Sequence, residues 1–173
     1  GHAVAVNLAP RTIGSSRLAE DLHGALTGAG ADPALLVIEL TETALAAHGP
    51  TGARLVDALR ETGCRLALDH FGTGHGGFTY LRRLPFDYLK IDAEFVRDLP
   101  DNAASRDVVC AIVQLARGLG QRTVATGVES EGTLDLLRDL GVDLAQGFAI
   151  GRPAPAQDAF GAAPGAWPRR SIV

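Results

Sequence analysis

Several features that mark particular classes of protein are scarce in this sequence. Aromatic residues make up 5% of the 173 residues, Lys90 is the only lysine, and the formal net charge is -4. This acidic balance with scattered arginines argues against a general nucleic-acid-binding surface, so we expect no nucleic-acid partner. No apolar run approaches the roughly 20 residues of a membrane span and no signal peptide is visible, so we expect no membrane attachment through this chain.

Cysteine is equally scarce. Cys64 and Cys110 are far apart in the sequence and form no CxxC pattern. Such a pair predicts buried structural thiols, as is usual for proteins of the reducing cytoplasm. We therefore expect a cytoplasmic protein.

The residues that are abundant predict a globular α/β domain. Hydrophobic residues account for 46% of the chain and charged residues for 21%, enough for one domain with its own core. Six short runs rich in Val, Ile and Leu lack a clean polar alternation, which is typical of strands buried on both faces. These runs are Ala3–Leu8, Leu35–Leu40, Arg65–Asp69, Tyr88–Ile91, Thr123–Ala125 and Asp143–Phe148. Helical patterns lie between them at Ser15–Thr27, Thr51–Thr62, Thr79–Leu84, Ala104–Gly118 and Ser130–Leu140.

This alternation predicts a parallel sheet built from β/α repeats. A (β/α) barrel has eight strands and about 250 residues, so we expect a TIM-barrel-like fold that is N-terminally incomplete, with about six of the eight strands. The barrel is incomplete, or its first strands lie outside this sequence, or a partner chain closes it. We expect the domain at residues 3–160 and a tail at 161–173, with one short helix after Pro153. The unpaired edges of an open barrel favour association, which predicts a dimer.

Polar side chains stand at the carboxyl ends of the predicted strands, where active sites of parallel α/β proteins lie. Asn7, Glu39 and Asp69 form an oxygen-rich set of the kind that holds Mg²⁺ or Mn²⁺. Lys90 is placed to orient a water or to neutralise charge that develops on a phosphate. The simpler alternatives are a helix cap for an acidic residue, a turn for Asn7, and a structural ion pair for Lys90.

The spacing of these strand ends resembles the EAL domain family over about residues 3–155. The matching segments are Asn7, Glu39-Leu40-Thr41-Glu42, Asp69-His70-Phe71-Gly72-Thr73-Gly74, Leu89-Lys90-Ile91-Asp92, Gly127-Val128-Glu129, Gln146-Gly147-Phe148 and Arg152-Pro153. The resemblance implies a modified TIM barrel that hydrolyses cyclic di-GMP to linear pGpG with two Mg²⁺ or Mn²⁺ ions.

The resemblance also implies roles for individual residues. Asn7, Glu39 and Asp69 match metal ligands, and His70 occupies the position of a further aspartate ligand. Lys90 matches the lysine that contacts the nucleophilic water, and Glu42 the glutamate that steadies the loop 71–77. Three positions match the ligand-binding side of the site, namely Asp92, Gln146 and Arg152.

Three departures from the family pattern remove charge from the expected site. The Glu-Ala-Leu signature is absent, His70 replaces the second residue of an Asp-Asp pair, and Thr126 replaces the first glutamate of a Glu-Gly-Val-Glu segment. Two divalent ions about 4 Å apart repel each other and need several carboxylates. We therefore expect a second metal site that is weak or absent, and impaired catalysis.

Three functions remain open at this point. The first is a degenerate EAL domain that acts as a regulatory or binding module, with cyclic di-GMP as a possible ligand. The second is an active phosphodiesterase whose missing strands lie outside this sequence. The third is a ligand-free scaffold that serves only to dimerise. As macromolecular partners we expect a second copy of the chain, in a homodimer, or a partner protein.

Overall fold

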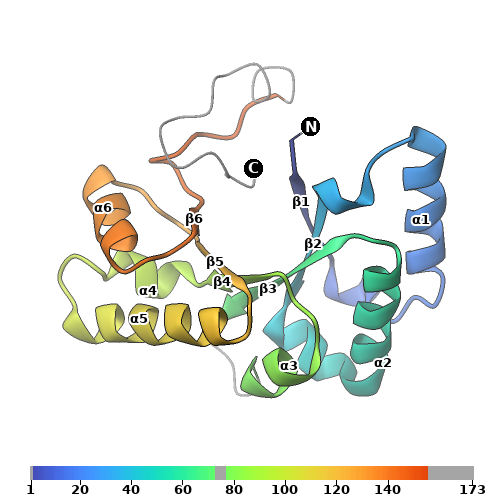
Figure 1. Ribbon diagram of the computed structural model, residues 1–173, viewed down its shortest axis with the longest axis horizontal. Helices are drawn as coiled ribbons and strands as arrows, with labels where there is room; N and C mark the ends of the chain where they lie inside the picture. Colours follow the sequence, from blue (N-terminus) through green and yellow to red (C-terminus); the bar gives the residue numbers. More distant parts are fainter. Residues whose placement is uncertain (1, 73–76, 156–173) are drawn as a thin grey trace. The chain divides into compact units, whose positions relative to one another are not determined.

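The computed structural model describes residues 2–72 and 77–155 (Figure 1). The strands are β1 (Val4–Asn7), β2 (Leu36–Thr41), β3 (Arg65–Phe71), β4 (Tyr88–Ile91), β5 (Arg122–Ala125) and β6 (Leu144–Ala145). The helices are α1 (Leu18–Ala29), α2 (Glu42–Glu61), α3 (Gly77–Arg83), α4 (Ala93–Arg97), α5 (Ala103–Gly118) and α6 (Glu131–Asp139). The strands follow one another in the sheet in chain order, and the pairs β1–β2, β2–β3 and β5–β6 are parallel. The predicted parallel β/α architecture is confirmed.

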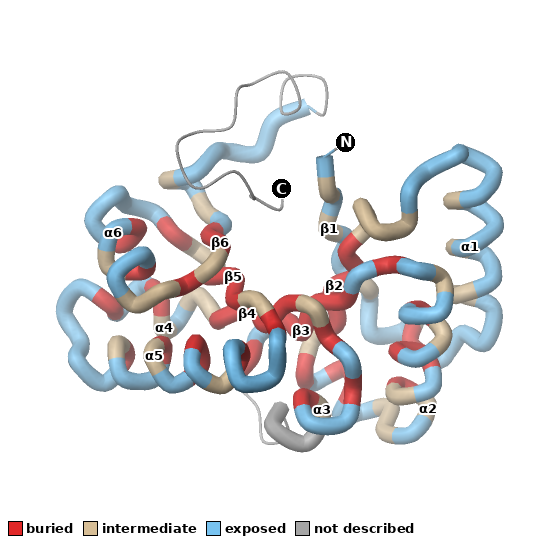
Figure 2. The backbone as a smooth tube through the Cα atoms, viewed as in Figure 1, coloured by how far each residue is buried: buried red, intermediate tan, exposed pale blue. Residues whose placement is uncertain are grey.

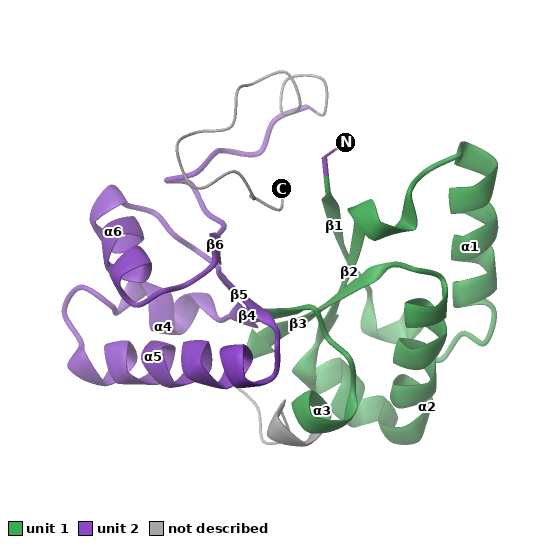
Figure 3. Ribbon diagram, in the orientation of Figure 1, with its two compact units in different colours: residues 1, 3–89 green, residues 2, 90–173 purple. Residues whose placement is uncertain are grey.

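The chain divides into two compact units (Figure 3), the first with residues 3–89 and the second beginning at residue 90. In the first unit the central strands β2 and β3 carry fully buried residues, and α2 packs against both strands. The buried side chains there include Val37, Leu40, Leu66 and Leu68. By contrast, β1 at the end of the strand order exposes Val4 and Val6 to 38% and 47%.

The second unit contains β5, β6 and the helices α4, α5 and α6. α5 packs against β5 and α4, and its buried face is formed by Val109, Ile112, Val113 and Ala116. Figure 2 shows buried residues concentrated along β2 to β6 and on one side of most helices, whereas β1 and α1 contain no buried residue. Burial explains why β2 to β6 read as continuous apolar runs. The first run, Ala3–Leu8, was also predicted to be buried on both faces, and that prediction is wrong, because β1 is mostly exposed.

Side-chain caps determine where several helices begin. The hydroxyl of Thr41 accepts a hydrogen bond from the Ala44 N–H at 3.2 Å and starts α2. Ser130 does the same for α6 through the Thr133 N–H. We predicted α2 only over Thr51–Thr62, and the structure starts it at Glu42 instead. The helical pattern is interrupted at Gly49, whose φ of 46° breaks the helix before Pro50, and this interruption hid the first two turns.

Other predictions need smaller corrections. α4 was not predicted, because its five residues are too few to show a helical period. The sixth strand is shorter than the predicted Asp143–Phe148. Cys64 is buried as predicted, whereas Cys110 is half-buried because neighbouring residues of α5 form the buried face. The helix predicted after Pro153 lies outside the described residues.

No helix in residues 2–72 and 77–155 combines the length and the apolar character needed to cross a membrane.

Candidate functional site

The carboxyl ends of β1, β2 and β3 bring the three predicted metal ligands to one face of the first unit. Asn7 lies opposite Glu39 in the register of β1 and β2, and Asp69 lies opposite Thr41 in the register of β2 and β3. Residues opposite each other in parallel strands project to the same face, and so do residues two apart on one strand, such as Glu39 and Thr41. Asn7, Glu39 and Asp69 therefore share one face at neighbouring strand ends.

The three side chains differ in burial. Glu39 is 6% exposed and Asp69 is 7% exposed, whereas Asn7 on the end strand is exposed. Buried carboxylates are costly without compensating interactions, and both carboxylate residues have interaction partners in the structure. Together the three residues offer two carboxylates and one amide oxygen, which are the donors that Mg²⁺ and Mn²⁺ prefer.

The donor set fits one hard ion better than two. Within the described ranges, no group of three or more His, Cys, Asp and Glu side chains is arranged to hold a metal ion. A single ion would therefore need the amide of Asn7 beside Glu39 and Asp69, with water completing the shell. Mg²⁺ commonly keeps several waters in such sites. A two-ion centre would need carboxylates that these residues do not supply.

His70 adopts an unusual backbone conformation directly after Asp69. Its φ is 57°, and it is the only residue other than glycine with positive φ in the described part of the chain. Histidine accepts this left-handed region more readily than most residues. The His70 N–H donates to Asp69 Oδ1 at 2.9 Å, and His70 Nε2 lies 3.8 Å from Asp69 Oδ2. The ring is 56% exposed, so it sits beside the carboxylate but faces solvent.

Glu42 lies at the start of α2, directly after β2, and is 2% exposed. The N-terminus of a helix stabilises a negative charge in its first turn, so α2 itself stabilises the buried carboxylate of Glu42. The loop that the resemblance assigns to Glu42 includes residues 73–76, which lie outside the described residues. Its role toward that loop stays a prediction.

Lys90 and Asp92 belong to β4 and its carboxyl end. Lys90 is 4% exposed, and a buried ammonium is costly unless it is paired; the residue does have an interaction partner. Asp92 caps α4, because its Oδ1 accepts a hydrogen bond from the Glu94 N–H at 2.8 Å. The helix-cap alternative therefore describes part of what Asp92 does.

Thr126 stands at the end of β5, where the family pattern has a glutamate. Its hydroxyl donates to the carbonyl oxygen of Ile91 at 2.9 Å, and its N–H donates to the same oxygen at 3.2 Å. Gly127 follows with a φ of 71°, and a Cβ there would lie 2.6 Å from the Cβ of Ala93. The backbone is thus packed closely around Thr126, and its only hydrogen-bond donor group on the side chain is used within the fold.

Gln146 follows β6 and is held through its backbone. Its N–H donates to the Ala125 carbonyl at 2.8 Å, and its own carbonyl accepts from the Val128 N–H at 3.0 Å. A Cβ at Gly147 would overlap the backbone of Val128, so only glycine permits this close approach. The exposed side chain of Gln146 is therefore presented from a fixed backbone.

Arg152 lies over the ring of Phe148, with its guanidinium carbon 4.9 Å from the ring centre. Phe148 is 55% exposed, so the pair stands at the surface of the second unit. A guanidinium held on an aromatic face remains available to bind a phosphate. Phe148 belongs to one of the segments that carry the family resemblance, but its contact with Arg152 was not predicted; an aromatic residue four positions before an arginine was the available signal.

The parallel β/α architecture and the polar strand ends define a TIM-barrel-like class of protein. Residues 1–153 match the EAL domain family, and the chain belongs to that family. It is 38% identical over 152 residues to the cyclic di-GMP phosphodiesterase NbdA of Pseudomonas aeruginosa, covering 88% of this chain and 19% of that protein. The chain spans about a fifth of the length of most of the curated relatives it matches, for example 21% and 19% of two of them.

Solved structures give the same result for the fold. The PaMucR phosphodiesterase in complex with c-di-GMP superimposes with a TM-score of 0.85 at 34% identity, over 91% of this chain and 64% of that one. A manganese and c-di-GMP complex of BlrP1 from Klebsiella pneumoniae matches with a TM-score of 0.83 at 34% identity, over 88% of this chain and 39% of that one. The fold is thus the EAL type, present in part relative to full EAL domains.

Proposed function

We propose that this chain is a catalytically impaired EAL domain that serves as a regulatory or binding module in cyclic di-GMP signalling. The observation that carries the proposal is the replacement of two carboxylates at the strand ends. His70 turns an exposed imidazole beside Asp69, and Thr126 bonds its hydroxyl to the Ile91 carbonyl. Both positions have a glutamate or aspartate in the pattern that the chain resembles.

Charge balance supports a single metal ion. Glu39 and Asp69 carry two negative charges, which match one Mg²⁺ or Mn²⁺ held with the amide of Asn7. A second divalent ion about 4 Å away would add a repulsion on the order of 16 kcal/mol at an effective dielectric constant of 20. A bound ion would polarise a phosphate oxygen and activate a water. With one ion, the chain's own groups can hold the ligand but activate that water poorly.

Cyclic di-GMP carries two phosphodiester groups, and the chain offers cationic and polar partners for them. The guanidinium of Arg152 and the side chain of Gln146 are both exposed in the second unit, and we assign them to ligand binding. We assign Lys90 to the neutralisation of phosphate charge, and Asp92 to ligand binding together with Gln146 and Arg152. Glu42 is assigned to the support of the adjacent loop.

A second candidate function is an active phosphodiesterase within a longer protein. The relatives favour it, because NbdA is named a cyclic di-GMP phosphodiesterase and the present chain spans 19% of it. His70 and Thr126 belong to this chain whatever surrounds it, and they argue for the impaired module.

Calorimetric titration of cyclic di-GMP in Ca²⁺, repeated in Mn²⁺ while pGpG is followed by chromatography, tests both candidates. We expect binding without turnover. Arg152→Ala should weaken binding tenfold or more, whereas Arg97→Ala, which removes an exposed arginine from α4, should not. Turnover by the unaltered chain would establish the second candidate. The absence of any binding heat would contradict both candidate functions. The remaining function would then be the binding of protein partners.

The exposed strand β1 supports a proposal about assembly. Val4 and Val6 are large apolar side chains on a strand at the end of the sheet order, and such edges favour association. We propose a homodimer or a partner protein at this edge, in a cytoplasmic setting. Sedimentation analysis should show association that Val6→Lys reduces; a stable monomer at high concentration would contradict the proposal.

A further inference from the structure

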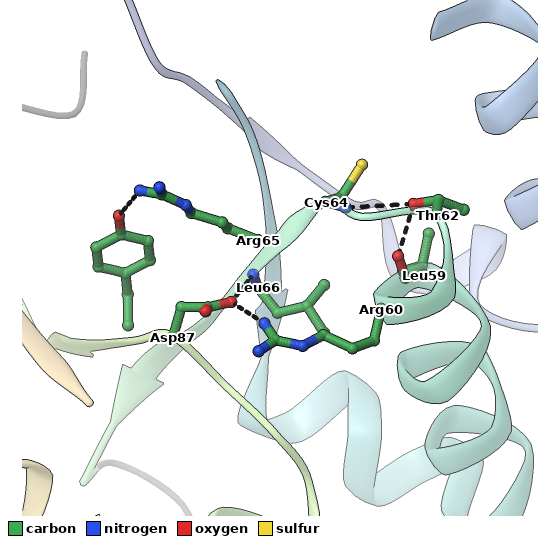
Figure 4. Close-up of polar contacts among 8 residues, drawn as sticks. Leu59, Arg60, Thr62, Cys64, Arg65, Leu66 and Asp87 are labelled. Atoms are coloured by element: carbon green, nitrogen blue, oxygen red, sulfur yellow. Dashed lines mark hydrogen bonds and ion pairs between the residues drawn. The ribbon is translucent and has the colours of Figure 1, made fainter. Parts of the chain in front are cut away.

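Asp87 and Leu66 form a reciprocal pair of hydrogen bonds at the beginning of β3 and β4. The Asp87 N–H donates to the Leu66 carbonyl at 2.9 Å. The Leu66 N–H donates back to Asp87 Oδ2 at 2.8 Å (Figure 4). Arg60 Nη1, from the last turn of α2, donates to the same carboxylate oxygen at 2.6 Å. The Asp87 carboxylate thus accepts a hydrogen bond that a backbone carbonyl would accept in a regular sheet. It extends the pairing of β3 and β4 by one residue.

Asp143 and Thr123 form the corresponding pair at the beginning of β5 and β6. Thr123 donates to Asp143 Oδ2 twice, from its N–H and from its hydroxyl, each at 2.9 Å. The Asp143 N–H donates back to the Thr123 hydroxyl oxygen at 3.0 Å. We call the two arrangements, Leu66–Asp87 and Thr123–Asp143, the aspartate clasps.

The two clasps occupy equivalent positions in the fold. Each aspartate directly precedes a strand, and each accepts the N–H of the second residue of the strand before it. The four clasp residues also lie three positions before four residues of the candidate site. These are Asp69 after Leu66, Lys90 after Asp87, Thr126 after Thr123 and Gln146 after Asp143. At about 3.3 Å per strand residue, each clasp is about 10 Å from the strand end that it serves.

The β5–β6 pairing is short enough to need such a device. β6 contains two residues, and its register with β5 consists of Val124 opposite Leu144 and Ala125 opposite Ala145. A slip of one residue in a parallel pairing turns every side chain to the opposite face. The clasp adds a third, side-chain-mediated step directly before these two pairs and thereby fixes which residue faces which.

We propose that the aspartate clasps are positioning devices, and that Asp143 sets the place of Gln146 beside the end of β5. The clasp is linked directly to Gln146, because the Gln146 N–H donates to the carbonyl of Ala125. Ala125 is the last β5 residue in the register that the clasp precedes. In the first unit, Asp87 ties the beginning of β4 to β3 and to the end of α2. The consequence for ligand affinity rests on the proposed function, whereas the positioning of Gln146 does not.

The test compares Asp143→Ala and Thr123→Val with a rescue variant, Thr123→Ser. Asp135→Ala is the control, since Asp135 is an exposed aspartate of the same unit that pairs with Arg138 on α6. Amide hydrogen exchange and the amide chemical shift of Gln146 report its placement, and calorimetry reports cyclic di-GMP affinity. We expect Asp143→Ala to speed exchange at Gln146 by about tenfold or more and to weaken binding in parallel.

Thr123→Val removes the hydroxyl and should change both readouts in the same direction as Asp143→Ala. Thr123→Ser keeps the hydroxyl and should leave both readouts near the native level, and Asp135→Ala should change neither. A fall in melting temperature with an unchanged Gln146 signal would overturn the proposal, because the clasp would then only stabilise. If Asp143→Ala does not fold, Thr123→Val, which leaves the Thr123 N–H bond intact, must still shift the Gln146 amide, or the proposal is wrong. A native chain that binds no cyclic di-GMP would overturn the proposed function, while the exchange data would still decide the positioning role.

Discussion

The imidazole of His70 lies beside the carboxylate of Asp69, with Nε2 3.8 Å from Oδ2, and the backbone N–H of His70 bonds the other oxygen at 2.9 Å. The same residue therefore orients a candidate metal ligand and withholds a second negative charge. Because the ring is 56% exposed, an aspartate can occupy the position without displacing buried neighbours. This relationship makes His70 the most direct place to test the charge argument.

His70→Asp should raise Mn²⁺ affinity about tenfold or more, because it adds a hard, negatively charged ligand next to Asp69. His70→Asn is the matched control: asparagine also accepts a positive φ but brings no charge. Calorimetry with Mn²⁺ and Mg²⁺ measures the effect on each ion. Equal affinities for the two variants would mean that charge at this position does not limit metal binding.

Thr126→Glu tests the second lost carboxylate. The hydroxyl bond to the Ile91 carbonyl is lost in this variant, so we expect a destabilisation of about 1 kcal/mol. Combined with His70→Asp it should produce measurable pGpG in Mn²⁺, whereas either single variant should remain near the native level. Thr126→Gln with His70→Asp is the control of similar size without the charge. Turnover by the combination with glutamine would show that activity does not depend on the carboxylate at position 126.

Much of this site could be predicted from the sequence, because strands buried on both faces and polar residues at their ends leave a local pattern. Glu39 and Asp69 were found in this way. The clasps were not predicted: Asp143 was placed at the start of the predicted strand Asp143–Phe148, and Asp87 was given no role. Their partners lie far back in the sequence, since Asp87 bonds Leu66, 21 residues before it, and Asp143 bonds Thr123, 20 residues before it. The positive φ of His70 likewise depends on the turn around it. Contacts distant in sequence and strained backbone leave no periodic signal.

Gly147→Ala should destabilise the second unit strongly. The added Cβ would overlap the backbone of Val128, which cannot rotate away as a flexible side chain can. We expect a loss of about 2 kcal/mol or more in the free energy of unfolding, as is typical of overpacking. Gly151→Ala is the control in the same segment, because no atom lies within 4 Å of its added Cβ. Urea unfolding measures both, and similar losses would contradict the packing argument.

The two bonds of the Asp87 carboxylate should differ in their contribution to stability. Arg60 and Asp87 form an ion pair between side chains that are 44% and 26% exposed, and solvent screening limits such a pair to about 1 kcal/mol or less. The Leu66 N–H is part-buried, and leaving such a donor without an acceptor costs about 1–3 kcal/mol. Arg60→Ala should therefore cost less than Asp87→Ala in urea unfolding, and Asp57→Ala, an exposed aspartate of α2, should cost almost nothing. A larger loss for Arg60→Ala would show that the ion pair, and not the backbone bond, holds the beginning of β4.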